Sequence, residues 1–170
     1  MIFTSVYELL MEIEKQREGK KVVLATGTFD LFHYDHLQYL QGAKNQGEIL
    51  VVAVKSDRCA GLKDPGRPII SQDQRVAIVD NIKGVDYTII VDYDSTVTPS
   101  VEAENEKQLE WLIIFEPLLK LLRPNILYYE NNPVLQSVRD KVLENYLIAG
   151  VMKARGTNTS TTEIIKKMKS

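Results

Sequence analysis

KVVLATGTFDLFHYDH, residues 21–36, joins an apolar, β-branched run to a glycine-containing turn and a pair of histidines. Its first six residues have the length of a strand and are almost continuously apolar, which is typical of a strand covered on both faces within a parallel sheet. We predict a turn over residues 27–30 and a helix from about residue 34 to residue 45. This order places the turn at the carboxyl end of a buried strand.

The rest of the chain continues the alternation of strands and helices. Strand-length apolar runs follow at residues 49–54, 87–91, 126–129 and 151–154. Helices are predicted over residues 5–18, 71–82 and 111–122, from residue 133 onward and after residue 160, with Ser5, Ser71 and Ser160 as N-caps. Such alternation implies right-handed crossovers. We therefore predict an α/β fold, a single Rossmann-like domain over residues 1–170 with a doubly wound parallel sheet.

One segment of the chain is less regular than the others. Residues 94–122 form a predicted insertion, in which a polar stretch at 94–106 precedes the strongly apolar helix. The polar stretch is either a mobile loop or a surface insertion without catalytic weight, and the second is the more ordinary outcome.

Composition and charge exclude several classes of protein. A formal net charge of -2 provides no basic field that would attract nucleic acid. The apolar runs are shorter than the roughly 20 residues of a membrane span, and the N-terminus does not resemble a signal peptide. Cys59 is the single cysteine, so no intrachain disulfide forms. We expect a cytoplasmic protein without nucleic-acid or membrane partners.

The two histidines carry the clearest chemical signal. His33 and His36 are three residues apart and share one face of a helix. They follow a strand end, where open parallel sheets bind ligands. Two imidazoles there can donate hydrogen bonds to phosphate oxygens and stabilise the charge on a five-coordinate phosphorus. The alternatives are a pair of packed structural histidines and a zinc site, which lacks further ligands at a matching spacing because Cys59 is isolated.

These residues also carry a resemblance to a known family. GTFDLFHYDH resembles the G-[TS]-F-D-x-x-H-x-G-H signature of the HxGH nucleotidyltransferases, within the cytidylyltransferase-like family. Among them, glycerol-3-phosphate cytidylyltransferases and heptose-1-phosphate adenylyltransferase domains are the nearest in motif. The resemblance implies that His33 and His36 contact the triphosphate and stabilise the transition state. It also implies a nucleotide site that includes Gly27, Thr28, Phe29 and Asp30.

Asp35 departs from this signature, since the family has glycine between the two histidines. A carboxylate at this position could point away, help to hold a metal ion or weaken triphosphate binding. The alternative to an active enzyme is therefore a catalytically impaired nucleotide-binding or regulatory module.

A second segment resembles the basic loop of the family and the helix that follows it. It spans residues 63–75 (KDPGRPIISQDQR). The resemblance implies a catalytic phosphate contact from Lys63, possible participation of Arg67, and support of the site by Arg75. A solvent-exposed turn before a well-capped helix is the alternative interpretation.

A third segment lies near the C-terminus. Residues 155–162 (RGTNTSTT) align with the family's R-T-x-G-I-S-T-T. The match implies that Arg155 clamps a phosphate and that Ser160, Thr161 and Thr162 bind another at the start of a helix, where free amides favour anions. An ordinary capped helix is the alternative.

The residues after the predicted strand at 126–129 differ from the family pattern. LYYENN, residues 127–132, places Tyr129 and Glu130 where the family carries Lys or Met followed by Gly and Asp near the base. By their position these two residues are predicted nucleotide contacts. The departure predicts an acceptor, and a base preference, different from those of both named enzyme types.

Together these motifs predict a nucleotidyltransferase. The expected reaction transfers AMP or CMP from ATP or CTP to a phosphorylated small molecule and releases pyrophosphate. Mg²⁺ is expected to enter with the triphosphate, and no protein ligand for it is predicted. The family resemblance implies a homodimer.

Overall fold

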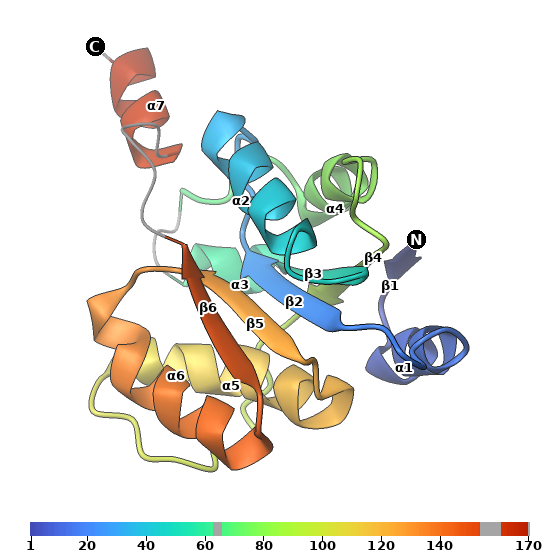
Figure 1. The fold of residues 1–170 in the computed structure, drawn as a ribbon. Coiled ribbons are helices and arrows are strands. Elements are labelled where there is room, and N and C mark those ends of the chain that lie inside the picture. Colours follow the sequence, from blue (N-terminus) through green and yellow to red (C-terminus); the bar gives the residue numbers. More distant parts are fainter. Residues whose placement is uncertain (63–65, 154–160, 170) are drawn as a thin grey trace.

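The computed structural model describes residues 1–62, 66–153 and 161–169. A six-stranded parallel sheet forms its centre, in the order β1-β4-β3-β2-β5-β6 (Figure 1). The strands are β1 (Ile2–Phe3), β2 (Val22–Gly27), β3 (Ile49–Lys55), β4 (Tyr87–Val91), β5 (Ile126–Glu130) and β6 (Ala149–Lys153). The predicted Rossmann-like parallel sheet is confirmed, with β1 as an additional edge strand that is too short for its pattern to be recognised in the sequence.

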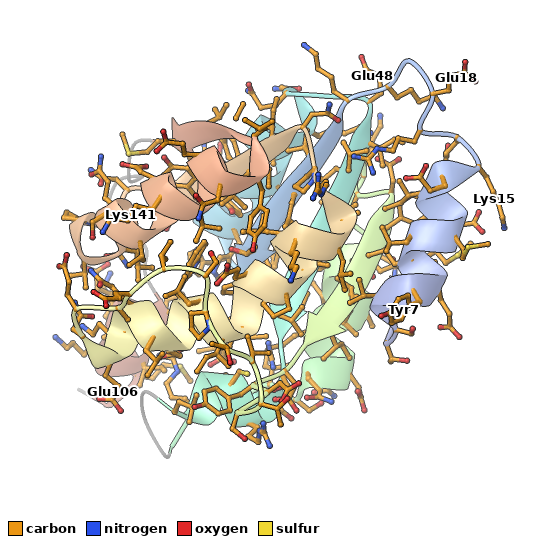
Figure 2. The ribbon with its side chains drawn as sticks, turned by 90° about the horizontal axis from the view of Figure 1, so that it is seen from below. Tyr7, Lys15, Glu18, Glu48, Glu106 and Lys141 are labelled. Atoms are coloured by element: carbon orange, nitrogen blue, oxygen red, sulfur yellow. The ribbon has the colours of Figure 1, made fainter. Side chains whose placement is uncertain are left out.

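Helices cover both faces of this sheet. They are α1 (Val6–Glu14), α2 (Tyr34–Lys44), α3 (Asp57–Gly61), α4 (Gln72–Asp80), α5 (Glu106–Leu122), α6 (Pro133–Tyr146) and α7 (Thr161–Lys169). Figure 1 shows α2 and α4 on one face and α5 and α6 on the other. Figure 2 looks onto the second face, with α1 beside α5 and α6. Within the described ranges, none of the helices combines the length and apolarity needed to cross a bilayer.

Several predicted helix ends were wrong. Helix α1 stops at Glu14 and not at residue 18, and a short helix that was not predicted, α3, follows β3. Helix α5 begins five residues before the apolar pattern does, because the Asn105 side chain caps it by accepting from the Gln108 amide at 3.1 Å. Neither Ser5 nor Ser71 makes the predicted side-chain capping bond.

The central strands are buried on both faces, as their continuous apolar sequence predicts. Every residue of β3 and the first four residues of β2 are buried. Alternate side chains divide into two hydrophobic clusters, one under α1, α5 and α6 and the other under α2 and α4. Fully burying one such Val, Leu or Ile side chain contributes about 1.5–3 kcal/mol relative to exposure.

The order in which the chain adds its parallel strands reverses between β2 and β5. From β2 the chain passes through α2, β3, α4 and β4 toward one edge, and from β5 it passes through α6 to β6 at the other. The two halves meet where Val23 pairs with Ile126 and Ala25 pairs with Tyr128. The crossover helices on the two sides lie on opposite faces, and in such sheets ligands bind beyond the carboxyl ends of the strands at this point. We call this region, beyond the ends of β2 and β5, the crevice.

Hydrogen bonds and close packing hold helix α2 against the junction of β2 and β5. The Tyr39 hydroxyl donates to the Tyr128 carbonyl at 2.7 Å and accepts from the Thr26 amide at 3.2 Å. One turn further along the helix, a Cβ on Gly42 would lie 2.4 Å from the Tyr128 hydroxyl. The close approach fixes the helix over β5, and with it the position of the two histidines at its start.

We expect Gly42→Ala to destabilise the protein, because the added methyl group overpacks the contact with the buried Tyr128 ring, which costs about 1–3 kcal/mol. The roughly 1 kcal/mol that alanine gains over glycine inside a helix offsets part of this cost, so the net loss is up to about 2 kcal/mol. Urea denaturation measures the difference, with exposed Gln41→Ala on the same helix as the control. A net stabilisation by Gly42→Ala would show that the helix does not depend on this contact.

Candidate functional site

The turn after β2 has an unusual backbone. Phe29 and Leu31 adopt left-handed conformations, with φ of 56° and 45°. The Phe29 ring folds back over Gly27, so that a Cβ at residue 27 would lie 2.8 Å from it. The aromatic ring therefore requires glycine at this position. Phe29 is itself buried, so any role in a nucleotide site is through the shape of the turn.

Asp30 holds the loop before α4 in place. Its carboxylate is only 1% exposed. It accepts from Arg67 at 3.0 Å and from the backbone amides of Ile69 and Ile70 at 3.1 and 3.0 Å. The predicted partners Asp30 and Arg67 are thus brought together, but through an internal ion pair that leaves little of the carboxylate for a ligand.

Arg75 connects this turn to the end of β3. The side chain is completely buried and donates to the carbonyls of Thr28, Ile70 and Lys55, the last two at 2.9 and 2.8 Å. It also pairs with the Asp57 carboxylate at 2.8 Å. A guanidinium with this set of partners positions backbone and does not reach a ligand, which agrees with the supporting role suggested for it.

The two histidines lie at the start of α2, directly over the crevice. Their rings stack, with 3.9 Å between the ring centroids and 27° between the ring planes. The His33 amide donates to His36 Nδ1 at 3.4 Å, so the neutral His36 ring carries its proton on Nε2. The Phe29 ring meets His36 edge-on at 5.4 Å. The turn therefore orients both rings before any ligand arrives.

Burial keeps both imidazoles neutral at pH 7. It is the largest cause that lowers the pKa of His36 to about 4, followed by the neighbouring His33, while Asp35 acts in the opposite direction. Burial also lowers the pKa of His33, against the charges of Asp35 and Glu130. Each neutral ring offers one N–H donor, and the stacked geometry disfavours a doubly protonated pair.

The opposite wall of the crevice comes from β5 and β6. Glu130 is exposed at the end of β5, in register with Lys153 of β6. Tyr129 points to the other face of the sheet, where its ring packs 3.9 Å from the guanidinium of Arg139. The structure therefore brings Glu130 toward His33, whereas Tyr129 lies on the α6 side.

The C-terminal motif reaches the same place. The Thr161 hydroxyl donates to the Asp30 carbonyl at 2.9 Å, although the two residues are 131 positions apart. The start of α7 thus lies against the turn that carries the histidines, and Thr162 beside it is exposed. The predicted contacts Lys63, Arg155 and Ser160 lie outside the described residues.

With this geometry established, comparison with known families is informative. The model of the family described as Cytidylyltransferase-like matches residues 24–167. The chain belongs to this nucleotidyltransferase family. The match runs from β2 to α7 and therefore includes both ends of the candidate site.

Curated relatives in this family agree with the assignment. The chain is 32% identical over 171 residues to the bifunctional protein HldE of Ectopseudomonas mendocina, covering 98% of this chain and 32% of the relative. It is 34% identical over 167 residues to HldE of Campylobacter concisus, covering 95% and 30%. The chain thus spans about a third of the length of these relatives.

Solved structures show the same fold at low sequence identity. Pantoate-beta-alanine ligase from Francisella tularensis superposes with a TM-score of 0.70 at 13% identity, covering 99% of this chain and 77% of that one. The lipopolysaccharide core biosynthesis protein of Thermoplasma volcanium superposes with a TM-score of 0.55 at 21% identity. The match covers 83% of this chain and 100% of that one. At these identities the likeness concerns the fold alone.

The acidic groups of this cytidylyltransferase-like site fit a magnesium ion only in part. Among the described residues, no three His, Cys, Asp or Glu side chains gather in a way that would hold a metal. Asp30 is engaged internally, which leaves Asp35 and Glu130, whose charges both act on His33. A magnesium ion here would take most of its oxygen ligands from the triphosphate.

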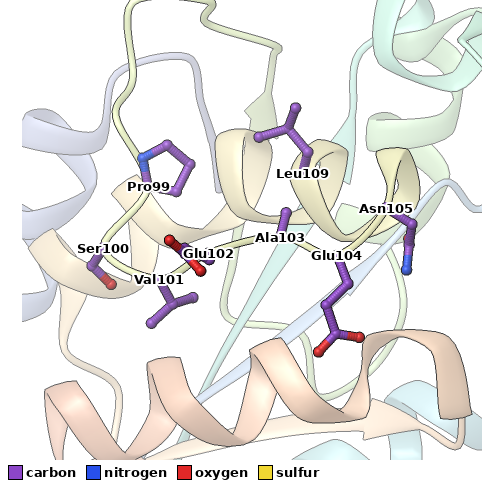
Figure 3. A pocket seen from close by; sticks show the side chains of 8 residues that line it. All are labelled: Pro99, Ser100, Val101, Glu102, Ala103, Glu104, Asn105 and Leu109. Atoms are coloured by element: carbon purple, nitrogen blue, oxygen red, sulfur yellow. The ribbon is translucent and has the colours of Figure 1, made fainter.

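A surface hollow lies elsewhere, on the predicted insertion (Figure 3). It has a volume of about 460 Å³ and is open, and it belongs to the polar stretch and the start of α5. Its lining residues are Pro99, Ser100, Val101, Glu102, Ala103, Glu104, Asn105 and Leu109. None of these is a predicted site residue.

Buried polar side chains fix the insertion to the helices behind it. The Glu116 carboxylate accepts from the Ser100 amide at 3.1 Å and from the Tyr146 hydroxyl at 2.9 Å. Gln108 accepts from the Glu104 amide at 2.7 Å. These contacts favour the interpretation as a packed surface insertion over that of a mobile loop.

Sequence reasoning missed two buried cations, Lys153 and Arg139. Each has a buried nitrogen without a hydrogen-bond partner in the described part of the chain, Nζ of Lys153 and Nε of Arg139. A basic residue at the end of an apolar strand is the signal that could have identified Lys153, because such a charge is costly to bury.

We expect His36 to make the folded protein less stable in acid. Its pKa is about 4 when folded and 6.5 ordinarily, so the unfolded chain binds the proton more tightly. The contribution of the neutral ring to stability is complete above pH 6.5 and is lost as the pH falls toward 4. The loss amounts to about 2 kcal/mol at pH 5. Urea denaturation at pH 7 and pH 5 should show a smaller difference for His36→Asn than for the parent. An equal difference in both proteins would contradict the buried, neutral state of the ring.

Proposed function

We propose that this protein is an enzyme that transfers a nucleoside monophosphate from ATP or CTP to the phosphate of a small-molecule acceptor and releases pyrophosphate. The observation that supports this most directly is the convergence of the stacked His33–His36 pair and the start of α7 on one turn at the switch point of the sheet. Both ends of the family match thus face one crevice.

The reaction that suits this geometry is in-line displacement at phosphorus. An oxygen of the acceptor phosphate forms a bond to the α-phosphorus, and the bond from that phosphorus to the bridging oxygen of the β-phosphate breaks. The electron pair leaves with pyrophosphate, whose charge bound Mg²⁺ would help to neutralise. Neutral imidazoles donate N–H bonds to the phosphate oxygens as negative charge develops, without a covalent intermediate.

The substrate class follows from the relatives and the motifs. The match to HldE, together with the motif resemblance to heptose-1-phosphate adenylyltransferase domains and glycerol-3-phosphate cytidylyltransferases, favours a sugar phosphate or a polyol phosphate as acceptor. The departure at Glu130, which is exposed at the crevice, favours an acceptor that differs from both of theirs.

The direct test is pyrophosphate release with ATP and with CTP across a panel of sugar phosphates, polyol phosphates and FMN. We expect release with one nucleotide and a narrow group of acceptors. Nucleotide binding without release for any acceptor in the panel would contradict the proposal.

Replacing either histidine should remove transition-state stabilisation. For His33→Asn and His36→Asn we expect kcat to fall on the order of 10²–10³-fold, as for the loss of one oxyanion donor. Gln38→Ala, an exposed change on the same helix, is the control and should leave kcat unchanged. Thermal unfolding of each variant separates loss of chemistry from loss of fold. Activity within a few-fold of the parent in both histidine variants would exclude them from catalysis.

Asp35 motivates the second candidate, a nucleotide-binding or regulatory module without turnover. Its carboxylate is partly buried in the first turn of α2, and its charge acts on both histidines. A negative charge so close to a bound triphosphate weakens anion binding.

Asp35→Gly distinguishes the two candidates. If the parent is an active enzyme, the substitution should strengthen nucleotide binding several-fold and leave an activity that was already present. If turnover appears only in Asp35→Gly, the parent is the binding module. Pyrophosphate release and calorimetric titration with ATP and CTP measure the two effects separately.

A further inference from the structure

Lys153 is a partly exposed residue whose ammonium nitrogen is buried. It is the last residue of β6, and its Nζ makes no hydrogen bond within the part of the chain that the structure describes. Glu130 lies opposite in register, yet the described side chains include no ion pair between them. Burying an ammonium group in this way costs free energy, which a protein tolerates where the charge has a use.

The side chain lies on the face of the sheet that carries α2. Val151 packs with the hydrophobic cluster under α2 and α4, and alternate residues of a strand share a face. Lys153 is two residues further along and therefore projects to the same side, at the carboxyl end of β6. Its charge is felt by His36, whose pKa is lowered first by burial and in smaller part by Lys153.

A second buried atom without a well-formed hydrogen bond is His33 Nδ1, at the start of α2. The His33 side chain does receive the His36 backbone amide in a capping box, so this atom is not an empty acceptor. The third such atom, Arg139 Nε, differs because its guanidinium stacks on the Tyr129 ring on the opposite face of the sheet. The unpartnered Lys153 ammonium group, whose charge acts on His36, indicates a place for a group that the described residues do not supply.

The neighbouring charges indicate which kind of group this is. Asp35 and Glu130 both place negative charge near His33, while the imidazoles are neutral. Arg67 is already paired with Asp30. An anion entering the crevice would be repelled by these carboxylates, and among the described residues the Lys153 ammonium group is placed to offset that repulsion.

We infer that Lys153 binds a phosphate group of the nucleotide and offsets the negative charge that Asp35 brings to the histidine motif. This inference rests on the proposed function, to which it adds a phosphate-binding residue outside the three motifs of the sequence. Because the ammonium group is buried, it is held ready for the phosphate and costs stability until the phosphate binds.

The experiment compares Lys153→Met with Lys153→Arg in the full chain. Methionine keeps the length and apolar stem of lysine without the charge, and arginine keeps the charge. Lys141→Met is the matched control, since Lys141 lies on the outer surface of α6 (Figure 2). Calorimetric titration with inorganic tripolyphosphate, ATP and CTP measures binding, and thermal unfolding without ligand measures stability.

For Lys153→Met we expect about a tenfold weaker affinity for tripolyphosphate and for the preferred nucleotide, together with an unchanged or higher melting temperature. Lys153→Arg should remain within a few-fold of the parent, and Lys141→Met should change neither quantity. A purely structural lysine would behave in the opposite way, with a lower melting temperature and unchanged affinity in Lys153→Met.

The outcomes separate this inference from the proposed function. Unchanged affinity in Lys153→Met, in a parent that binds nucleotide and turns over, overturns the inference alone. Binding that depends on Lys153 in a parent without turnover supports the inference and contradicts the proposed enzyme. A parent that binds neither tripolyphosphate nor nucleotide overturns both.

Discussion

The crevice of this protein depends on the Tyr39 hydroxyl group, which lies where the strand order reverses between β2 and β5. The backbone ladder between β2 and β5 ends at Ala25 and Tyr128, and the strands then separate. Their next polar groups would be left unpaired, which is costly away from water. The Tyr39 hydroxyl satisfies them by donating to the Tyr128 carbonyl and accepting from the Thr26 amide. The same side chain belongs to α2, so the bond that closes the sheet also positions the histidine pair.

A second layer of buried polar contacts holds the turn itself. Arg75 and Asp30 are almost inaccessible, and together they bind backbone groups of the turn, of the loop before α4 and of the end of β3. Left-handed backbone at Phe29 is tolerated because these contacts determine the path of the chain on both sides of it. Asp30 and Arg75, which belong to the predicted site motifs, thus make internal contacts, and these contacts keep the turn rigid.

Electrostatics then distinguishes this member of the cytidylyltransferase-like family. Burial makes the two imidazoles neutral hydrogen-bond donors, and Asp35 adds a negative charge where the signature has glycine. The proposed binding of a triphosphate therefore calls for positive charge from outside the histidine motif. Lys153 is the last residue of the last strand, β6, and lies on the face of the sheet that carries α2, where it can provide this charge.

Much of this could be predicted from the sequence, because it depends on local pattern. Continuous apolar runs identified the central strands, and the spacing of His33 and His36 placed both at the start of a helix after a strand. Features that depend on distant partners could not be predicted: β1 pairs with β4 from the other end of the chain, and Lys153 is significant only beside His36. The same holds for Gly27, whose missing side chain makes room for the Phe29 ring. The sequence by itself determined the order of the elements and the chemistry of the motifs, since periodicity and residue type are local. The tertiary structure alone decided which charges meet at the crevice, because that depends on the register of strands far apart in the chain.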